Sequence, residues 1–206
     1  MDITQIIKYL SDSKEIINAG LFAITFVVYA ENGLFFAFFL PGDYLLFLTG
    51  VFVGSGLLLY PITTVILYLF LAAVIGSLTG FLFGRFFGNT LENRPDTWYF
   101  KRKHLDATRD FFEKYGSQAL IISRFLPYIR TFAPILAGIS KMNYPKYLFL
   151  NITGGAIWVV SLVGGGYWFG VKFPWIINYV HYIVLFFLFI TTFTVIKGYF
   201  NIRKKS

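Results

Sequence analysis

The sequence predicts an all-α integral membrane protein, and three observations support that fold class. Of its 206 residues, 57% are hydrophobic and only 14% are charged. Residues 62–83, 147–169 and 176–196 are each long enough to cross about 30 Å of hydrocarbon. Other apolar segments are interrupted by proline, glycine and isolated charges, which is typical of broken helices within a membrane. We therefore expect one domain in which two opposed re-entrant helical hairpins form an inverted repeat among transmembrane helices.

The N-terminal half is expected to contain an interfacial helix, a hairpin and a span. Residues 1–15 have an apolar helical face and charges of both signs, unlike a cleavable signal peptide, so we expect them to be retained at the interface. Residues 16–61 hold the first span and first re-entrant hairpin, with breaks at Pro41 and Gly42. Whether they begin with one long helix, and on which side Met1 lies, stays open. Residues 62–84 are a predicted transmembrane helix.

The C-terminal half is expected to begin and end in the cytoplasm. Residues 85–117 carry seven basic side chains and read as an amphipathic cytoplasmic segment, and residues 198–206 are a basic tail. Spans are predicted at 146–170 and 175–197. With a cytoplasmic tail, these two spans start from the cytoplasm at residue 146 and return to it at residue 197. Both ends of residues 118–143 are then cytoplasmic, so that segment should be re-entrant, with Pro127 and Pro134 as its breaks.

Short matches between the two halves indicate an internal repeat. The tripeptide FLP occurs at 39–41 and again at 125–127, and the dipeptide Tyr-Pro occurs at 60–61 and 144–145. A glycine-bearing span follows each Tyr-Pro. In the first span the glycines recur every four residues, on one helix face where they permit close helix packing: Gly76, Gly80, Gly84 and Gly88.

Four charged residues stand inside the apolar segments: Glu31, Asp43, Arg124 and Arg130. Each costs about 2.5 to 3.5 kcal/mol at a helix centre, so we expect the acids and the arginines to meet one another. The alternative is that the arginines snorkel to the cytoplasmic interface while the acids face the outer one.

If the charges meet, the arginines suit an anionic headgroup such as a phosphate, because guanidinium offers forked donors. The two carboxylates could take up and release protons. Asn151 and Trp158 could line the same cavity, although packing is the commoner role for each. The net charge of +8 indicates positive-inside bias and attraction to anionic lipids, and does not indicate a nucleic-acid partner.

Enzyme chemistry is not expected. The chain has no cysteine and only two histidines, His104 and His181, which lie far from the four charges in the sequence. Two isolated histidines do not make a metal site or the histidine pair of a lipid phosphatase. The glycines follow helix-packing spacing and form no phosphate loop. We therefore expect no cofactor and no metal.

Three sequence runs carry a resemblance that covers roughly residues 19–170. The runs ENGLFFAFFLPGD, GFLFGRFFG and ISRFLPYIRTFAPILAG resemble the bacterial DedA family, whose membrane domain is shared with eukaryotic VTT-domain lipid scramblases. The resemblance implies two opposed re-entrant hairpins, a functional acidic pair at Glu31 and Asp43, and an essential arginine pair at Arg124 and Arg130. It also implies a multi-pass protein of the bacterial cytoplasmic membrane, linked to the proton motive force and envelope integrity.

Some members of that family are flippases for undecaprenyl phosphate, so we expect a proton-coupled transporter of an anionic lipid, with that lipid first. A flippase or scramblase for another phospholipid, and a proton-coupled ion or drug antiporter, remain alternatives. In a non-transporting assembly protein the four charges would form a structural network instead. The expected partners are the lipid substrate, protons and membrane lipids. The oligomeric state is open, and a homodimer is compatible with the sequence.

Overall fold

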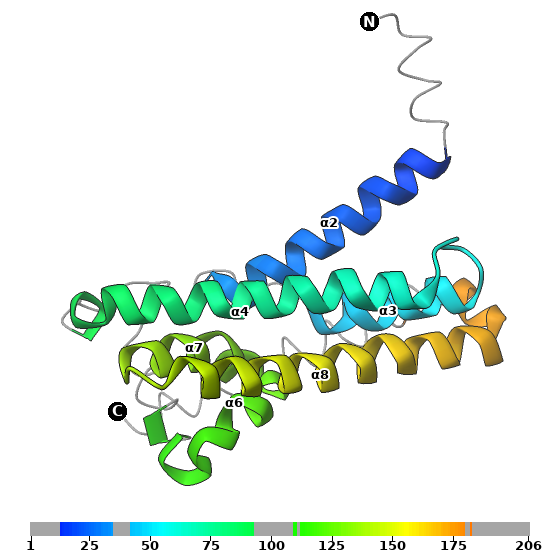
Figure 1. Cartoon of the computed structure of the whole chain (residues 1–206). Helices are drawn as coiled ribbons and strands as arrows, with labels where there is room; N and C mark the ends of the chain where they lie inside the picture. The colour runs from blue at the N-terminus through cyan, green and yellow to red at the C-terminus, as the bar shows by residue number, and fades with distance from the viewer. Residues whose placement is uncertain (1–12, 35–41, 93–108, 111, 180–181, 183–206) are drawn as a thin grey trace, which may run out of the picture. The chain divides into compact units, whose positions relative to one another are not determined.

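Every regular element that the computed structural model describes is helical (Figure 1). The described residues are 13–34, 42–92, 109–110, 112–179 and 182. In chain order the elements are α2 (Ser13–Gly33), α3 (Gly42–Gly54), α4 (Ile62–Glu92), the 3₁₀ helix η1 (Gly116–Gln118), α6 (Ala119–Ile122), the 3₁₀ helix η2 (Ser123–Phe125), α7 (Pro127–Ile139), α8 (Tyr144–Lys172) and the 3₁₀ helix η3 (Pro174–Tyr179).

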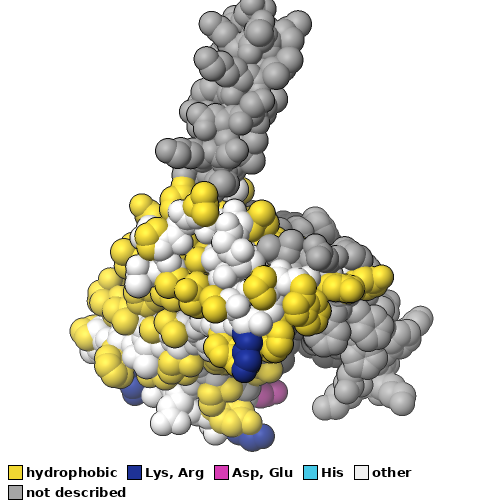
Figure 2. Space-filling model, turned by 90° about the vertical axis from the view of Figure 1, so that its right-hand side faces the viewer, with side chains coloured by type: hydrophobic (Ala, Val, Ile, Leu, Met, Phe, Trp, Pro, Cys, Tyr) yellow, Lys and Arg dark blue, Asp and Glu magenta, His cyan; other side chains and the backbone are white. Residues whose placement is uncertain are grey.

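Two of the described helices are long and apolar enough to cross a membrane, at Ile62–Gly88 and Tyr144–Lys172. Large apolar side chains are exposed along α4 at helical spacing, at Leu67, Leu71, Ile75, Leu82 and Phe86. Exposing such a row of apolar side chains is unfavourable in water and favourable in lipid. On the face drawn in Figure 2, hydrophobic side chains are abundant and charged ones are few among the described residues.

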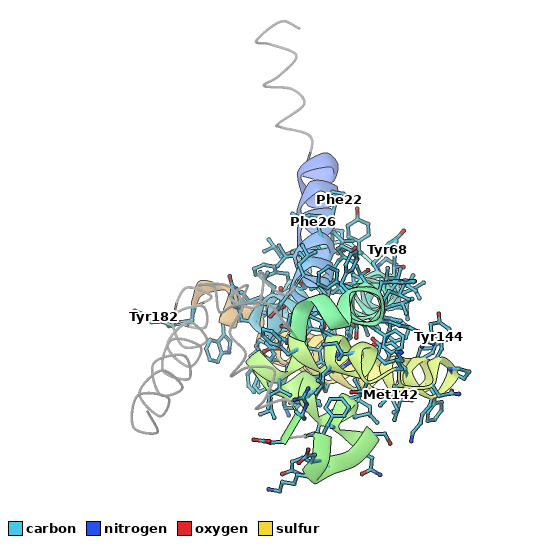
Figure 3. The ribbon with its side chains drawn as sticks, turned by 90° about the vertical axis from the view of Figure 1, so that its left-hand side faces the viewer. Phe22, Phe26, Tyr68, Met142, Tyr144 and Tyr182 are labelled. Atoms are coloured by element: carbon cyan, nitrogen blue, oxygen red, sulfur yellow. The ribbon has the colours of Figure 1, made fainter. Side chains whose placement is uncertain are left out.

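The helix boundaries refine the predicted domain limits. Helix α2 begins at Ser13 and ends at Gly33, so the first hydrophobic region is not one continuous helix. Its exposed Phe22 and Phe26 lie one turn apart (Figure 3). Gly42 is the first residue of α3, while Pro41 and residues 1–12 lie outside the described residues. The predicted last span at 175–197 begins in η3, and most of it also lies outside them.

Helix α4 continues to Glu92, eight residues beyond the predicted end of the span at residue 84. Arg85 directly follows that predicted end, and arginine is a good helix former. Its side chain is on the exposed face of α4, where its Nη1 donates a hydrogen bond to the Met142 carbonyl at 3.3 Å. A single charged residue at that position therefore does not end the helix. Residues 93–108 of the predicted amphipathic segment lie outside the described part of the chain.

The second predicted hairpin is a helical hairpin with one break. Leu126 is extended, with φ −119° and ψ 108°, and Pro127 begins α7, where a missing N–H costs nothing. Leu120 of α6 shares a buried apolar cluster with Ala133 and Ala137 of α7, so the chain folds back there. Pro134 was predicted as a second break and is not one.

Helix α7 runs through Pro134 to Ile139. A proline inside a helix removes one hydrogen bond, here the bond to the carbonyl of Arg130, and need not end the helix when tertiary packing holds it. The flanking residues supply that packing, because residues 131–138 are all buried. Proline chemistry alone therefore did not determine where α7 ends.

The chain forms two compact units, one of residues 1–40 and 63–161 and the other of residues 41–62 and 162–206. In the first unit α7 packs backbone to backbone on the C-terminal half of α4. A Cβ atom on Gly138 would overlap the carbonyl oxygen of Phe81, and one on Gly84 would overlap that of Ile135. Gly76 and Gly88 are also buried close to backbone atoms, of α2 and α7 respectively, whereas Gly80 has ordinary contacts.

In the second unit α3 packs in the same way on the C-terminal half of α8. A Cβ atom on Gly50 would overlap the carbonyl oxygen of Val163, and one on Gly166 would overlap that of Phe47. The two interfaces have the same register, with corresponding residues Gly50 and Gly138, Phe47 and Ile135, Val163 and Phe81, and Gly166 and Gly84. Each half of the sequence thus contributes its short helix to the long helix of the other half. The inverted orientation of the two halves and the re-entrant path stay predictions.

Candidate functional site: a buried polar cluster at the end of α2

Eight polar side chains gather in the interior of the first unit, and none is more than 4% exposed. They come from α2, α4, η2, α7 and α8: Glu31, Asn32, Ser77, Ser123, Arg124, Arg130, Thr131 and Asn151. Close helix packing brings the end of α2 into this cluster. A Cβ atom on Gly76 would lie 2.5 Å from the Tyr29 carbonyl oxygen, and one on Gly33 would lie 2.9 Å from that of Gly76. Both positions therefore need glycine for α2 to approach α4.

Glu31 and Arg130 form a buried ion pair in this cluster. Glu31 is in the last turn of α2 and Arg130 is in the first turn of α7. The Arg130 guanidinium also lies 4.9 Å from the ring centre of Trp158, a fully buried residue of α8. Arg130 is thus held by a carboxylate and by an aromatic face, two partners that stabilise a cation in a dry environment.

Arg124 has different partners, and they are amides. Its Nη2 donates to the side-chain Oδ1 of Asn151 and, at 3.2 Å, to the Asn151 carbonyl oxygen. Its Nη1 donates to the Oδ1 of Asn32 at 3.5 Å. Gly154 of α8 makes room for this side chain, since a Cβ atom there would lie 3.2 Å from Arg124 Nε.

A further hydrogen-bonded pair joins α4 to α8 beside the cluster. The Tyr147 hydroxyl donates to the Ser77 carbonyl at 2.8 Å and lies 2.9 Å from the Ser77 hydroxyl. The Tyr147 ring stacks on Phe81 with centroids 3.9 Å apart. Tyr147 therefore seals the polar cluster on the side of the apolar core that contains Leu120, Ala133 and Ala137.

A small cavity of about 10 Å³ lies between the two arginines. Six of the eight polar residues line it, together with Leu120 and Pro134. This volume admits about one water molecule, and a water there would find several hydrogen-bonding partners. A phosphate headgroup is much larger than a water. In the described conformation this cavity therefore has room for about one water molecule and not for a phosphate group.

The cluster unites three of the four predicted intramembrane charges and both predicted lining residues, Asn151 and Trp158. Asp43 is in the first turn of α3, which belongs to the second unit. Asn32 also belongs to the cluster and was not predicted from the sequence, unlike its charged neighbour Glu31. A second polar residue next to a charge in an apolar helix was the available signal.

The residues described in this cluster do not resemble a metal centre. Within the described ranges, no three His, Asp or Glu side chains come together as a metal site requires. His104 and His181 lie outside those ranges. The chemistry that the cluster offers is hydrogen bonding and charge: two guanidinium groups, one carboxylate, two side-chain amides and three hydroxyls.

Comparison with known proteins gives this cluster its family context. The family model described as the VTT domain matches residues 40–168. Protein DedA of Escherichia coli strain K12 is 36% identical over 151 residues, which is 73% of this chain and 69% of that protein. The chain belongs to the DedA family.

Two further relatives are similarly close in sequence. Inner membrane protein YqjA of the same strain is 38% identical over 164 residues, covering 77% of this chain and 70% of YqjA. An uncharacterized membrane protein of Mycobacterium tuberculosis is 38% identical over 155 residues, covering 74% of this chain and 67% of that protein. No solved structure matches the chain. The predicted family is thus confirmed, and the relatives' names identify membrane proteins. Within this DedA-family chain the VTT match includes both arginines, while Glu31 lies before it.

Proposed function

We propose that this DedA-family protein moves an anionic lipid, first of all undecaprenyl phosphate, across the bacterial cytoplasmic membrane without changing it chemically. The proton motive force drives the movement, and the chain crosses the membrane several times. The observation that carries the proposal is the burial of two arginines that line the same small cavity. Two guanidinium groups offer the forked donors that a phosphate accepts best.

The ion pair of Glu31 with Arg130 supports proton coupling. While Glu31 is ionised, it occupies Arg130. Once Glu31 takes a proton, its attraction for the guanidinium falls, and Arg130 can exchange the carboxylic acid for a phosphate oxygen. When the phosphate leaves, Glu31 loses its proton and pairs with Arg130 again. A proton then moves once in each transport cycle, and Asp43 serves as a second proton carrier in the other unit.

Transbilayer movement of a fluorescent polyprenyl phosphate in proteoliposomes tests the proposal. The native chain is compared with Glu31→Gln and Arg130→Ala, with and without an imposed pH gradient. Lys146→Ala is the matched control, because it removes a cation from an exposed position on α8. We expect gradient-dependent movement in the native and control chains and its loss in the other two.

Each contrary result identifies an alternative. Lipid movement at the same rate with and without the pH gradient would indicate a scramblase. If the folded native chain does not move the lipid phosphate, the proposed substrate is wrong. Other phospholipids and then proton-coupled ion or drug flux would be measured next.

A further inference from the structure

The two buried arginines are held by partners of different charge, and this difference carries an inference that rests on the proposed function. Arg130 is paired with the Glu31 carboxylate. The acceptors that Arg124 meets among the described residues of its unit are all neutral amide oxygens, two from Asn151 and one from Asn32. Within that part of the structure, the positive charge of Arg124 is therefore stabilised by hydrogen bonds to neutral oxygens and is not balanced by a negative charge.

The two asparagines are fixed with their side-chain oxygens toward Arg124. Asn32 Nδ2 donates to the Val28 carbonyl at 2.8 Å, and Asn151 Nδ2 donates to the Val74 carbonyl at 3.0 Å. Each amide nitrogen is thus bound to a helix backbone, which leaves the oxygen as the end available to the guanidinium. An acidic residue at either position would supply the same oxygen with a negative charge.

An anion replaces a neutral acceptor more readily than it replaces a carboxylate. Hydrogen bonds to a charged acceptor are roughly twice as strong as those to a neutral one, so an anionic oxygen gains by displacing an amide from Arg124. It gains little by displacing Glu31 from Arg130. The cavity between the arginines lies beside these same amides and gives an entering oxygen a place to bind.

We propose that Arg124 is the first contact of the anionic headgroup, and that Asn32 and Asn151 are positioning residues whose amide oxygens occupy the headgroup oxygen sites in the resting state. Arg130 binds second, after Glu31 releases it. The order favours a terminal phosphate monoester, which has several oxygens on one end and can bind Arg124 while another oxygen waits for Arg130. A diester exposes only two unesterified oxygens, so it satisfies both arginines less well.

Asn151→Asp tests this inference because it keeps the size and the oxygen of the side chain and adds a negative charge. The probe is farnesyl phosphate, with farnesol as the neutral comparison, and binding to the purified full chain in detergent is measured directly. We expect Asn151→Asp to weaken farnesyl phosphate binding by about tenfold or more, because the new carboxylate competes for Arg124. Asn32→Asp should act in the same direction with a smaller effect, since its oxygen is farther away, at 3.5 Å.

Two controls separate charge from damage to the fold. Asn151→Leu removes the amide without adding a charge and should weaken binding less than Asn151→Asp. Asn143→Asp adds the same charge at an exposed position before α8 and should leave binding unchanged. Helical circular dichroism and the melting temperature show which variants fold. If Asn151→Asp does not fold, the binding of farnesyl phosphate to Asn32→Asp tests the inference instead.

The outcomes distinguish this inference from the function on which it rests. Suppose that the native chain binds farnesyl phosphate and that Asn151→Asp and Asn32→Asp bind it equally well. This result would overturn the proposed role of Arg124 as first contact, but not the proposed function. Equal losses in Asn151→Leu and Asn151→Asp would overturn it too, because charge would then not matter. If the native chain binds farnesol as well as farnesyl phosphate, anion recognition itself is wrong and the proposed function falls with it.

Discussion

Glu31 and Arg130 each lie at the end of their own helix that disfavours their charge. The C-terminal end of a helix carries partial negative charge and the N-terminal end partial positive charge. Glu31 is in the last turn of α2, and Arg130 is in the first turn of α7. Each residue is therefore disfavoured by its own helix and favoured by the other, so the ion pair offsets two unfavourable helix-end interactions.

The first prediction concerns this mutual dependence. Glu31→Gln should lower the free energy of unfolding by about 3 kcal/mol, because it removes the negative charge of a carboxylate that is paired with a buried guanidinium. The double variant Glu31→Gln with Arg130→Gln should be less destabilised than the sum of the two single variants. Denaturant unfolding in detergent measures all four corners of the cycle. Additive losses would show that the pair contributes no coupling.

The second prediction concerns Trp158, whose ring lies against the Arg130 guanidinium. Trp158→Phe keeps an aromatic face, and Trp158→Leu removes it. The Leu variant should be less stable than the Phe variant by about 1 to 2 kcal/mol, which is the strength of a buried cation–π contact. Thermal melting gives the comparison. Equal stabilities would mean that Trp158 only fills space.

At the residue scale, the buried charged residues could be predicted from the sequence more readily than their hydrogen-bond partners. The sequence identified Glu31 and Arg130 because a charge in an apolar segment is costly and must find a partner. It could not identify Asn32 and Asn151 as the partners of Arg124, since an amide has no comparable cost and occurs often at helix ends. The role of Asn32 depends on which residues α4 and η2 bring beside it, and that information is tertiary.

At the element scale, the glycines of α4 differ although their spacing is uniform. Gly84 meets the backbone of α7, because its Cβ atom would overlap the Ile135 carbonyl. At Gly80, one turn earlier, the nearest atoms that a Cβ atom would meet are the side chains of Pro134 and Ile135 at 3.6 Å and the Asn32 carbonyl at 3.7 Å. The regular spacing predicted close helix contacts but could not rank them. Pro134 shows a similar limit, because local chemistry predicted a helix end where packing maintains the helix.

The third prediction follows from that difference. Gly84→Ala should lower the free energy of unfolding by about 1 to 3 kcal/mol, because two helix backbones must separate to admit the methyl group. Gly80→Ala should be neutral or slightly stabilising, since alanine favours helix by about 0.8 to 1 kcal/mol over glycine. Parallel melting curves test the pair. A Gly84→Ala variant as stable as Gly80→Ala would contradict the close packing of α7 on α4.

At the scale of the whole molecule, the matching registers of the two helix pairs predict matching sensitivities. Gly166 of α8 occupies the position that Gly84 occupies on α4. We therefore expect Gly166→Ala to destabilise the protein as much as Gly84→Ala. Its neighbour is the control, because a Cβ atom on Gly165 has nothing within 4 Å. Equal effects of Gly165→Ala and Gly166→Ala, read from melting temperatures, would argue against the shared register.

A further prediction concerns the apolar exterior. Trp168 is 52% exposed and Trp158 is fully buried, and both are on α8. If the exposed apolar surface faces lipid, brominated acyl chains should quench the fluorescence of Trp168 and spare that of Trp158. The chain has four tryptophans, so the measurement uses variants in which Trp158 or Trp168 is the single tryptophan left, reconstituted in brominated bilayers. Equal quenching would mean that lipid reaches the interior of the first unit.

The exchange of short helices between the two halves of the chain also has a consequence for biosynthesis. Helix α3 leaves the ribosome early, but the α8 surface that receives Phe47 and Gly50 is made only after α4 and α7 are complete. During translation the glycine face of α3 therefore stays uncovered until α8 is synthesised, whereas α4 is already complete when α7 is made. The first half therefore cannot finish folding as it is inserted, and an insertase or chaperone that shields α3 during that interval would protect the nascent chain from mispairing.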